Sequence, residues 1–273
     1  MKHMDYLARE SAPFSSEIWE RIDNAVIENL KRHLVCRRFL SLYGPLGAGA
    51  AVVSVDTNDK SEEFSNGVAR ITGRKLVELP QLYEDFTLLW RDMEAAEKEG
   101  RPLDLSAAAA AAQRMAKRED DLILFGNKEL GMEGLLNAKG SFKVKRGNWK
   151  EGEDAYRDVA HGIAHLSSSS LLGRYALILS PDVYLDLQRL VPNVGLLELD
   201  RISKLVDGRV YATGAFGANK AVLVCAESQY MDLAVGADLG VGYLELKDFN
   251  HAFRILETAA LRIKDPNAIV VFE

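Results

Sequence analysis

Residues 50–86 form a segment too long to fold within the body of a compact subunit of this length. Two apolar arms, residues 51–55 and 68–79, flank a charged stretch, residues 56–66. A strand rises about 3.3 Å per residue, so an arm of about a dozen residues reaches about 40 Å. A compact chain this long has a radius of gyration of about 19 Å. We therefore expect a hairpin that projects from the body and lies on a neighbouring copy, since an isolated two-stranded ribbon is only marginally stable.

Two other segments have the pattern of packed helices. Apolar residues recur at three- and four-residue spacing over residues 18–34, and Ser15 precedes them as a cap. A second helix is predicted over residues 105–125, with Gly126 as its stop. Its six consecutive alanines, residues 107–112, favour helix and carry almost no side-chain bulk. We expect this helix to be central and closely packed.

The second half of the chain alternates short helices and strands and indicates a mixed α/β subdomain. The predicted helices cover residues 154–166, a segment beginning at Ser180 and Pro181, and residues 196–206. The predicted strands cover residues 175–179, 210–213 and 221–225, and most of residues 232–272. No internal repeat is present.

Charge and composition exclude several classes of partner. The chain has 34 basic and 40 acidic residues, a net charge of -6, so no basic field attracts phosphates and nucleic acid is not expected. Cys36 and Cys225 lie far apart in apolar segments and are expected to be buried, reduced thiols. No window approaches the roughly 18 to 20 apolar residues of a membrane span, and residues 1–14 do not resemble a secretory signal. We expect a cytoplasmic protein without a membrane partner.

One pair of histidines could bind a metal. His161 and His165 stand four residues apart on a predicted helix, a spacing that can chelate zinc. The catalytic zinc pattern needs a glutamate beside the first histidine, where this chain has Gly162. A metal-dependent hydrolase is therefore an alternative from a different class, and two structural histidines are the simpler interpretation.

Three further features have structural interpretations. Residues 44–49 are glycine-rich but lack the lysine and hydroxyl residue of a P-loop, which favours a turn into the hairpin. Residues 119–121 are acidic and directly follow two basic residues, a pattern typical of a solvated helix face. Gly240 and Gly242 lie in a predicted strand, where they indicate either a bulge or the close approach of another backbone or a ligand.

A series of different short motifs follows a specific order along nearly the whole chain. They are Tyr6-Leu7, Ala12-Pro13, Trp19, Ile22-Asp23, Arg37-Arg38-Phe39, Tyr43-Gly44-Pro45-Leu46-Gly47, residues 86–94, residues 102–106, Glu119-Asp120, Phe125-Gly126, Gly134-Leu135, residues 238–243 and residues 265–268. In their order and spacing they resemble the shell proteins of encapsulin nanocompartments, the type 1 family once described as linocin-like bacteriocins.

The resemblance implies an α+β fold, that of the major capsid proteins of tailed phages. It implies an N-terminal arm and helix of a peripheral domain at 1–49, an extended loop at 50–86, the peripheral domain with its spine helix at 87–133, an axial domain at 134–230 and C-terminal peripheral strands at 231–273.

The resemblance also implies what such a chain does. Many copies would assemble into a closed icosahedral shell around a cargo enzyme that carries a terminal targeting peptide. Ferritin-like iron oxidases, which serve iron storage and protection from oxidative stress, are the family's commonest cargo, and dye-decolorising peroxidases come next. The shell would then be structural, with no cofactor of its own and the iron handled by its cargo. A phage-type capsid protein that packages DNA is the alternative with the same fold.

Three sites follow from the resemblance. The cargo peptide would dock in a luminal apolar groove made by Leu30, Leu34, Arg37, Phe39, Val241 and Tyr243, residues that could otherwise be ordinary core. The loop Pro192, Asn193, Val194 and Gly195 would line the fivefold pore. Some members stack a flavin on an exterior tryptophan, and Trp90 lies one residue from that position, where Arg91 stands. Met4 matches the family's usual start.

Overall fold

The alanine-rich stretch forms one long helix, α3 (Ser106–Phe125), in a computed structural model of the chain. The structure describes residues 6–191 and 195–273, without the side chains of residues 58 and 59. Ala108, Ala111 and Ala112 are fully buried, and helix α1 (Ser16–His33) packs against α3. The hydroxyl of Ser15 caps α1 by accepting from the Ile18 amide. Both predicted helices are confirmed to within two residues.

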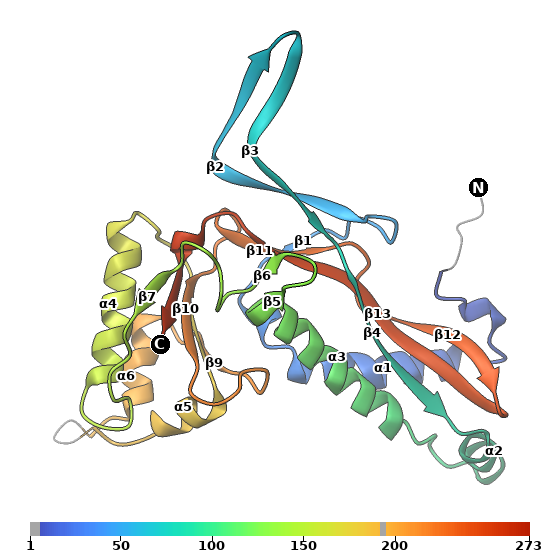
Figure 1. Ribbon diagram of the computed structural model, residues 1–273. Helices are drawn as coiled ribbons and strands as arrows, with labels where there is room; N and C mark the ends of the chain where they lie inside the picture. Colours follow the sequence, from blue (N-terminus) through green and yellow to red (C-terminus); the bar gives the residue numbers. More distant parts are fainter. Residues whose placement is uncertain (1–5, 192–194) are drawn as a thin grey trace.

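Both helices lie on a sheet whose central strand is β13 (Asn250–Ile263). The first half of β13 runs between β12 (Gly240–Lys247) and β4 (Gln81–Leu88), antiparallel to both. Its second half pairs with β11 (Met231–Val235), which is followed by the short parallel strand β1 (Leu42–Tyr43). Segments from the beginning, middle and end of the chain therefore meet in one sheet (Figure 1).

An aromatic core fills the space between this sheet and the two helices. The ring of Phe253 stacks on that of Phe86 at 5.0 Å between centroids, and Trp19 meets Phe253 edge-on at 5.7 Å. Ile22 of α1 and Met115 of α3 are fully buried in the same cluster. Removing this apolar surface from water is the main force that holds α1 and α3 on the sheet.

A second body is built on another five-stranded sheet with its own core. Its strands, in spatial order, are β7 (Phe142–Val144), β14 (Ile269–Phe272), β10 (Ala221–Cys225), β8 (Tyr175–Leu179) and β9 (Val210–Ala212). Its helices are α4 (Asp154–Ser168), α5 (Pro181–Asp186) and α6 (Glu198–Leu205). The α/β alternation predicted for the second half of the chain is therefore confirmed.

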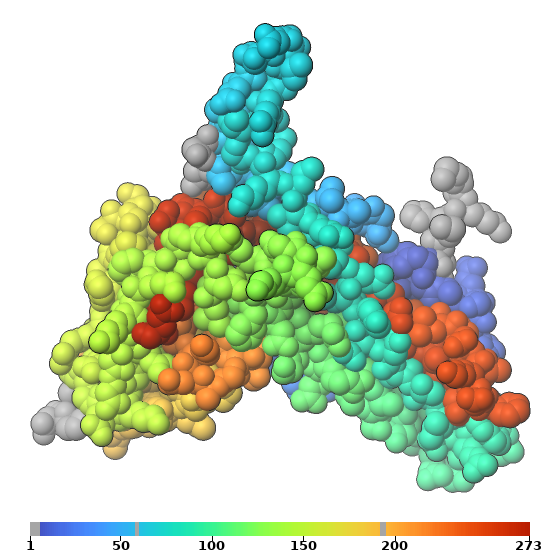
Figure 2. All heavy atoms as spheres, in the orientation of Figure 1, coloured from blue at the N-terminus to red at the C-terminus, as the bar shows by residue number. Residues whose placement is uncertain are grey.

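The hairpin of strands β2 (Val52–Ser65) and β3 (Val68–Glu78) stands away from both bodies (Figures 1 and 2). Its tip was predicted as a charged stretch over residues 56–66, but the strand continues to Ser65 and the tip is the pair Asn66 and Gly67. Both tip residues have positive φ, +52° and +76°, as a two-residue type I′ turn requires. At this distance from the body the ribbon has no buried face. Polar side chains are therefore tolerated on both faces, and the strand continues through them.

The last strand and helix α2 also differ from what the sequence predicts. Residues 231–273 were all assigned to the C-terminal strands of the peripheral domain, but β14 lies in the sheet of the second body, between β7 and β10. Helix α2 (Trp90–Glu99) was not predicted. None of its residues is buried, so it packs only partly against the core.

Short elements complete the fold. They are the 3₁₀ turns η1 (Arg9–Ser11), η2 (Cys36–Arg38) and η3 (Pro266–Ala268) and the two-residue strands β5 (Gly126–Asn127) and β6 (Met132–Glu133). Cys36 and Cys225 are buried free thiols, as predicted. Among the helices of the described residues, none is long and apolar enough to cross a membrane.

Candidate functional site

A groove of about 360 Å³ runs between the C-terminal half of α1 and the turn that joins β11 to β12. Leu30 and Leu34 are buried in its floor, and Ile27, with 43% of its surface exposed, stands at its side. Leu239 closes it from the β12 side. These α1 residues share one face because they recur at three- and four-residue spacing. The groove can therefore hold aliphatic side chains of an extended segment.

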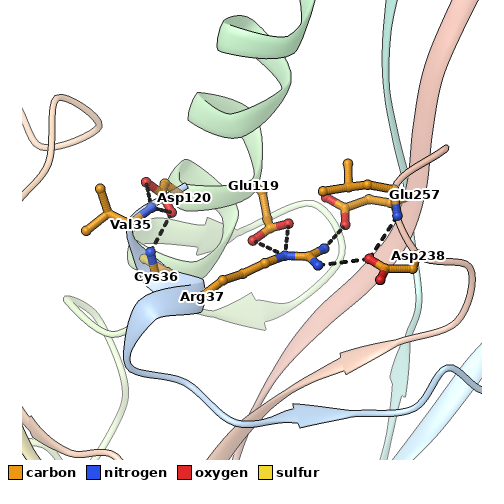
Figure 3. Close-up of polar contacts among 8 residues, drawn as sticks. Val35, Cys36, Arg37, Glu119, Asp120, Asp238 and Glu257 are labelled. Carbon is orange, nitrogen blue, oxygen red and sulfur yellow. Dashed lines mark hydrogen bonds and ion pairs between the residues drawn. The ribbon is translucent and has the colours of Figure 1, made fainter. Parts of the chain in front are cut away.

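One wall of the groove is held by Arg37, which binds three carboxylates at once (Figure 3). Its Nε donates to Glu119 of α3 at 2.8 Å, its Nη1 to Asp238 of the turn at 2.8 Å, and its Nη2 to Glu257 of β13 at 2.6 Å. Glu119 and Glu257 are completely buried, whereas Asp238 is largely exposed at the groove. The bridge thus fixes the turn before β12 relative to α3 and β13.

The two buried carboxyls cannot both be charged beside a single guanidinium without a large cost. Burial, and then the charge of Glu119, raise the pKa of Glu257 well above its ordinary value. Burial also raises the pKa of Glu119, against the attraction of Arg37. Burial opposes the charge of Arg37 itself, but Glu119 and Glu257 outweigh it and raise its pKa. We therefore place a proton on Glu257 and the negative charge on Glu119.

Asp120 fixes the chain that carries Arg37. Its carboxylate accepts from the backbone amide of Val35 at 3.1 Å and from that of Cys36 at 2.9 Å, and from the Thr213 hydroxyl at 3.4 Å. Burial raises the pKa of Asp120, and these hydrogen bonds act against the rise. The short turn η2 is thereby held at the end of α1, which directs Arg37 toward its partners.

The acidic stretch 119–121 is therefore not a solvated face. Glu119 and Asp120 are buried, and only Asp121, paired with Lys117 at 3.0 Å, follows the prediction. The prediction was wrong because the partners of the two buried carboxylates lie more than 80 residues away in the sequence. Local charge alternation contains no signal for such partners. An acidic pair on the inward face of an alanine-rich helix is the one local sign.

The structure brings most of the predicted groove residues together. Leu30, Leu34 and Arg37 line the open groove. Val241 and Tyr243 are buried in the same core cluster as Leu30, on the neighbouring strand β12. Val241 and Tyr243 therefore lie in the core and do not line the open groove. Phe39 is farther away: it belongs to the core of the second body, where its ring lies 5.8 Å from that of Tyr211. Phe39 is therefore a core residue that does not line the groove, since the chain turns away from α1 at η2.

The other predicted sites lie elsewhere. Trp90 begins α2, half-exposed, with the Arg91 guanidinium 5.6 Å from its ring centroid, beside a separate hollow of about 570 Å³. One side of the ring is thus occupied by the chain itself, and flavin binding stays a prediction. Of the pore loop, residues 192–194 fall outside the described residues, and Gly195 is exposed. The fivefold pore likewise stays a prediction.

His161 and His165 do not form part of a metal centre in the described residues. The ring of His165 stacks on Phe142 at 3.6 Å between centroids, and His161 meets the same ring edge-on at 5.9 Å. No group of three or more His, Cys, Asp or Glu side chains in the described parts of the chain could hold a metal ion. The hydrolase alternative therefore gains no geometric support.

Solved structures with the same fold are shells. The chain resembles the virus-like particle from Pyrococcus furiosus with a TM-score of 0.75 and 23% identity, covering 94% of this chain and 100% of that one. It resembles the capsid of Myoviridae phage XM1 with a TM-score of 0.64 and 15% identity, covering 88% and 91%. The fold of this chain is that of tailed-phage capsid proteins. The protein is therefore of the capsid-like class.

Sequence comparison identifies the family. A family model described as "Encapsulating protein for peroxidase" matches residues 4–260. The type 1 encapsulin shell protein EncA of Myxococcus xanthus is 38% identical over 280 residues, covering 98% of this chain and 96% of that protein. The chain belongs to the encapsulin shell protein family. It is a structural shell subunit that assembles with many copies of itself, and it is not an enzyme.

Proposed function

We propose that the shell encloses a ferritin-like, iron-oxidising enzyme, held by a terminal peptide of that enzyme in the groove between α1 and the β11–β12 turn. The groove is the observation that carries the proposal, because it is open and its floor is aliphatic. An extended peptide binds such a surface by inserting alternate side chains while its backbone forms hydrogen bonds. The shell would work in the cytoplasm, in iron storage and protection from oxidative stress.

Two relatives support an enclosed redox protein. One is the diheme-cytochrome-encapsulin shell fusion protein of Kuenenia stuttgartiensis, 37% identical over 275 residues and covering 96% of this chain and 76% of that protein. The other is the ferritin-like-encapsulin shell fusion protein of Pyrococcus furiosus, 25% identical over 211 residues and covering 77% and 57%. In a fusion, the covalent link keeps the second module with the shell. A separate cargo chain needs a non-covalent site, and we assign that role to the groove.

The exposed apolar residues of the hairpin favour assembly in which the hairpin of one copy packs on the next copy. Phe64 and Leu76 are 76% and 71% exposed, and Val68 is also exposed, although each could bury apolar surface against a neighbour. The hairpin contacts neither body along its outer half in Figure 2. We place this apolar surface on an adjacent subunit of the shell, which would order a ribbon that cannot stabilise itself.

A dye-decolorising peroxidase is the second candidate cargo. It is favoured by the description of the matching family model as an encapsulating protein for peroxidase. Both cargoes would use the same groove, so the groove alone does not choose between them. The ferritin-like fusion relative favours the ferritin-like enzyme.

The test is to purify the protein from its native host and to combine negative-stain electron microscopy with mass spectrometry. We expect closed particles with a co-purifying ferritin-like protein. The variant Ile27→Asp should form the same particles but retain about tenfold less cargo, because it replaces an aliphatic side chain beside the aliphatic floor by a charged one, at a cost of about 1.4 kcal/mol or more. The matched control Ile27→Leu should load normally. Particles without a ferritin-like protein, or equal loading by Ile27→Asp, would contradict the proposal.

A further inference from the structure

The N-terminal segment, residues 7–14, covers the outer edge of β12 (Figure 1). The Leu7 carbonyl accepts from the Tyr243 amide at 2.8 Å, and the Arg9 Nε donates to the Val241 carbonyl at 2.9 Å. These are two backbone groups that β12 directs away from β13. The segment, called the N-terminal strap below, thus takes the place of a neighbouring strand at this edge.

The strap also binds α1, so it bridges α1 and β12. Both terminal nitrogens of Arg9 donate to Asp23 of α1, at 2.7 and 2.8 Å. The Arg9 guanidinium lies 4.6 Å from the centroid of the Trp19 ring. At its far end, Phe14 stacks on Phe253 at 5.7 Å and so anchors the strap in the aromatic core.

The two glycines of β12 make room for the strap. A Cβ atom at Gly242 would lie 3.1 Å from the Leu7 carbonyl oxygen, and one at Gly240 would lie 3.7 Å from the Leu7 side chain. Any side chain at residue 242 would therefore crowd the Leu7 backbone. The sequence left a bulge and the close approach of another backbone or a ligand as alternatives for these glycines. The backbone of Leu7 approaches Gly242, whereas the register with β13 is continuous through both glycines and shifts only between Tyr243 and Glu245.

The open groove and the strap-covered edge follow each other along the same two elements. Leu239, which closes the open groove, directly precedes Gly240, which the Leu7 side chain approaches. On α1, the face that begins at Leu34 and Leu30 in the open groove continues to Trp19 beside Arg9. The open groove and the strap-covered edge of β12 are therefore consecutive, and the two together are called the channel below; the chain's own residues 7–14 cover its second part.

We propose that the N-terminal strap is an internal competitor for this channel, and that the cargo peptide gains its full binding site only when the strap leaves β12. The inference rests on the proposed function and adds regulation to the same site. A bound strap reduces the apparent affinity for cargo by the fraction of subunits whose channel is free. With the strap bound in about nine of ten subunits, the reduction is about tenfold.

The test uses the strap as its own probe, so no natural cargo needs to be identified. A fluorescent protein carrying residues 6–14 at its C-terminus is produced together with one of two shells, the full chain or a chain that starts at Ala12 after its initiating methionine and keeps Phe14. We expect about tenfold more fluorescence per shell for the shortened chain, because only its β12 edge is free. A tag with Leu7→Asp and Arg9→Asp should load neither shell. Equal loading of the two shells by the intact tag, or none in either, would overturn the proposal.

A point variant covers the case in which the shortened chain does not assemble. Arg9→Ala keeps the full chain but removes the contacts to Asp23 and Val241, and it should load more tag than the full wild-type chain. Arg157→Ala, which removes an exposed arginine from α4, is the matched control and should change nothing. Wild-type loading by an assembled Arg9→Ala shell would also overturn the proposal.

Natural cargo separates this inference from the proposed function. If Ile27→Asp blocks the cargo while the tag loads both shells equally, the groove assignment stands and the strap competition fails. If the tag loads only the shortened chain while Ile27→Asp leaves cargo loading unchanged, the strap covers β12 as inferred, but the groove assignment fails, and competition of the strap with cargo fails with it.

Discussion

Arg37 holds two buried carboxyls side by side, and the proton that one of them keeps makes the subunit sensitive to pH. Glu257 faces Glu119 from α3, Arg37 from η2 and Asp238 from the turn before β12. Its pKa is raised well above the ordinary 4.5 by burial and by Glu119. The folded chain therefore keeps a proton that the unfolded chain has lost, and the free energy of unfolding falls as the pH rises above about 4.5.

The substitution Glu257→Gln tests this directly, since glutamine can still accept from Arg37 but cannot ionise. We expect the melting temperature of the wild-type shell to fall more steeply than that of the variant as the pH rises above about 5. The difference corresponds to at most about 1.4 kcal/mol for each pH unit. Asp121→Asn, at a partly exposed carboxylate, is the control and should follow the wild type. If the melting temperatures of wild type and Glu257→Gln change with pH in parallel, Glu257 does not carry the proton.

The groove residues could be predicted only in part. Leu30 and Leu34 follow from helical periodicity, which identifies a buried face but not whether a groove opens beside it. Arg37 was assigned to the groove through a resemblance, and its three carboxylate partners are set by tertiary structure that no local pattern describes. Phe39, two residues later, was assigned with it and lies in the other core. A two-residue step across the end of a helix is enough to change which core a side chain enters.

At the scale of elements, the contact between α1 and α3 depends on the small size of alanine. Ala111 has no exposed surface and packs in the cluster that contains α1. Ala111→Leu should lower the free energy of unfolding by about 1 to 3 kcal/mol, because the added atoms have no space. Ala110→Leu, on the exposed side of the same helix, is the control and should change stability little. Thermal unfolding of both variants measures the difference, and equal melting temperatures would show that the interface can relax.

Elements with strong local signals were predicted well, and those set by context were not. The alanine run and Gly126 define α3 without help from the rest of the chain. The hairpin tip was misplaced because polar residues were taken as the end of a strand, whereas the Asn66 and Gly67 pair carried the turn signal. The last strand, β14, was assigned to the wrong sheet, because an apolar run of four residues fits any buried sheet equally well.

At the scale of the whole molecule, the hairpin should matter for assembly and not for folding of the subunit. Replacing residues 62–71 by Asn-Gly keeps Ser61 opposite Thr72 and removes the exposed Phe64. We expect a subunit that melts at the wild-type temperature when both are measured as unassembled chains, but that no longer forms closed shells. Light scattering after size-exclusion chromatography measures assembly.

The polar face of the same hairpin provides the control. Glu63 and Arg70 lie opposite each other, and the double variant Glu63→Gln, Arg70→Gln keeps the ribbon's length and its apolar residues. It should assemble. Normal shells from the shortened hairpin would show that its outer half is dispensable.

The two sheets also set an order of events during synthesis. Strand β13 lies at the centre of one sheet and β14 lies between β7 and β10 in the other, yet both follow every other strand in the sequence. While the ribosome is still translating residues 250–272, β11, β12 and β4 lack their common partner, and β7 is not joined to β10. A nascent chain can therefore display its hairpin but cannot offer a finished body for another hairpin to embrace. The last two strands of the sequence thus complete both sheets, and a chain that stops before β14 should form neither a finished body nor a shell.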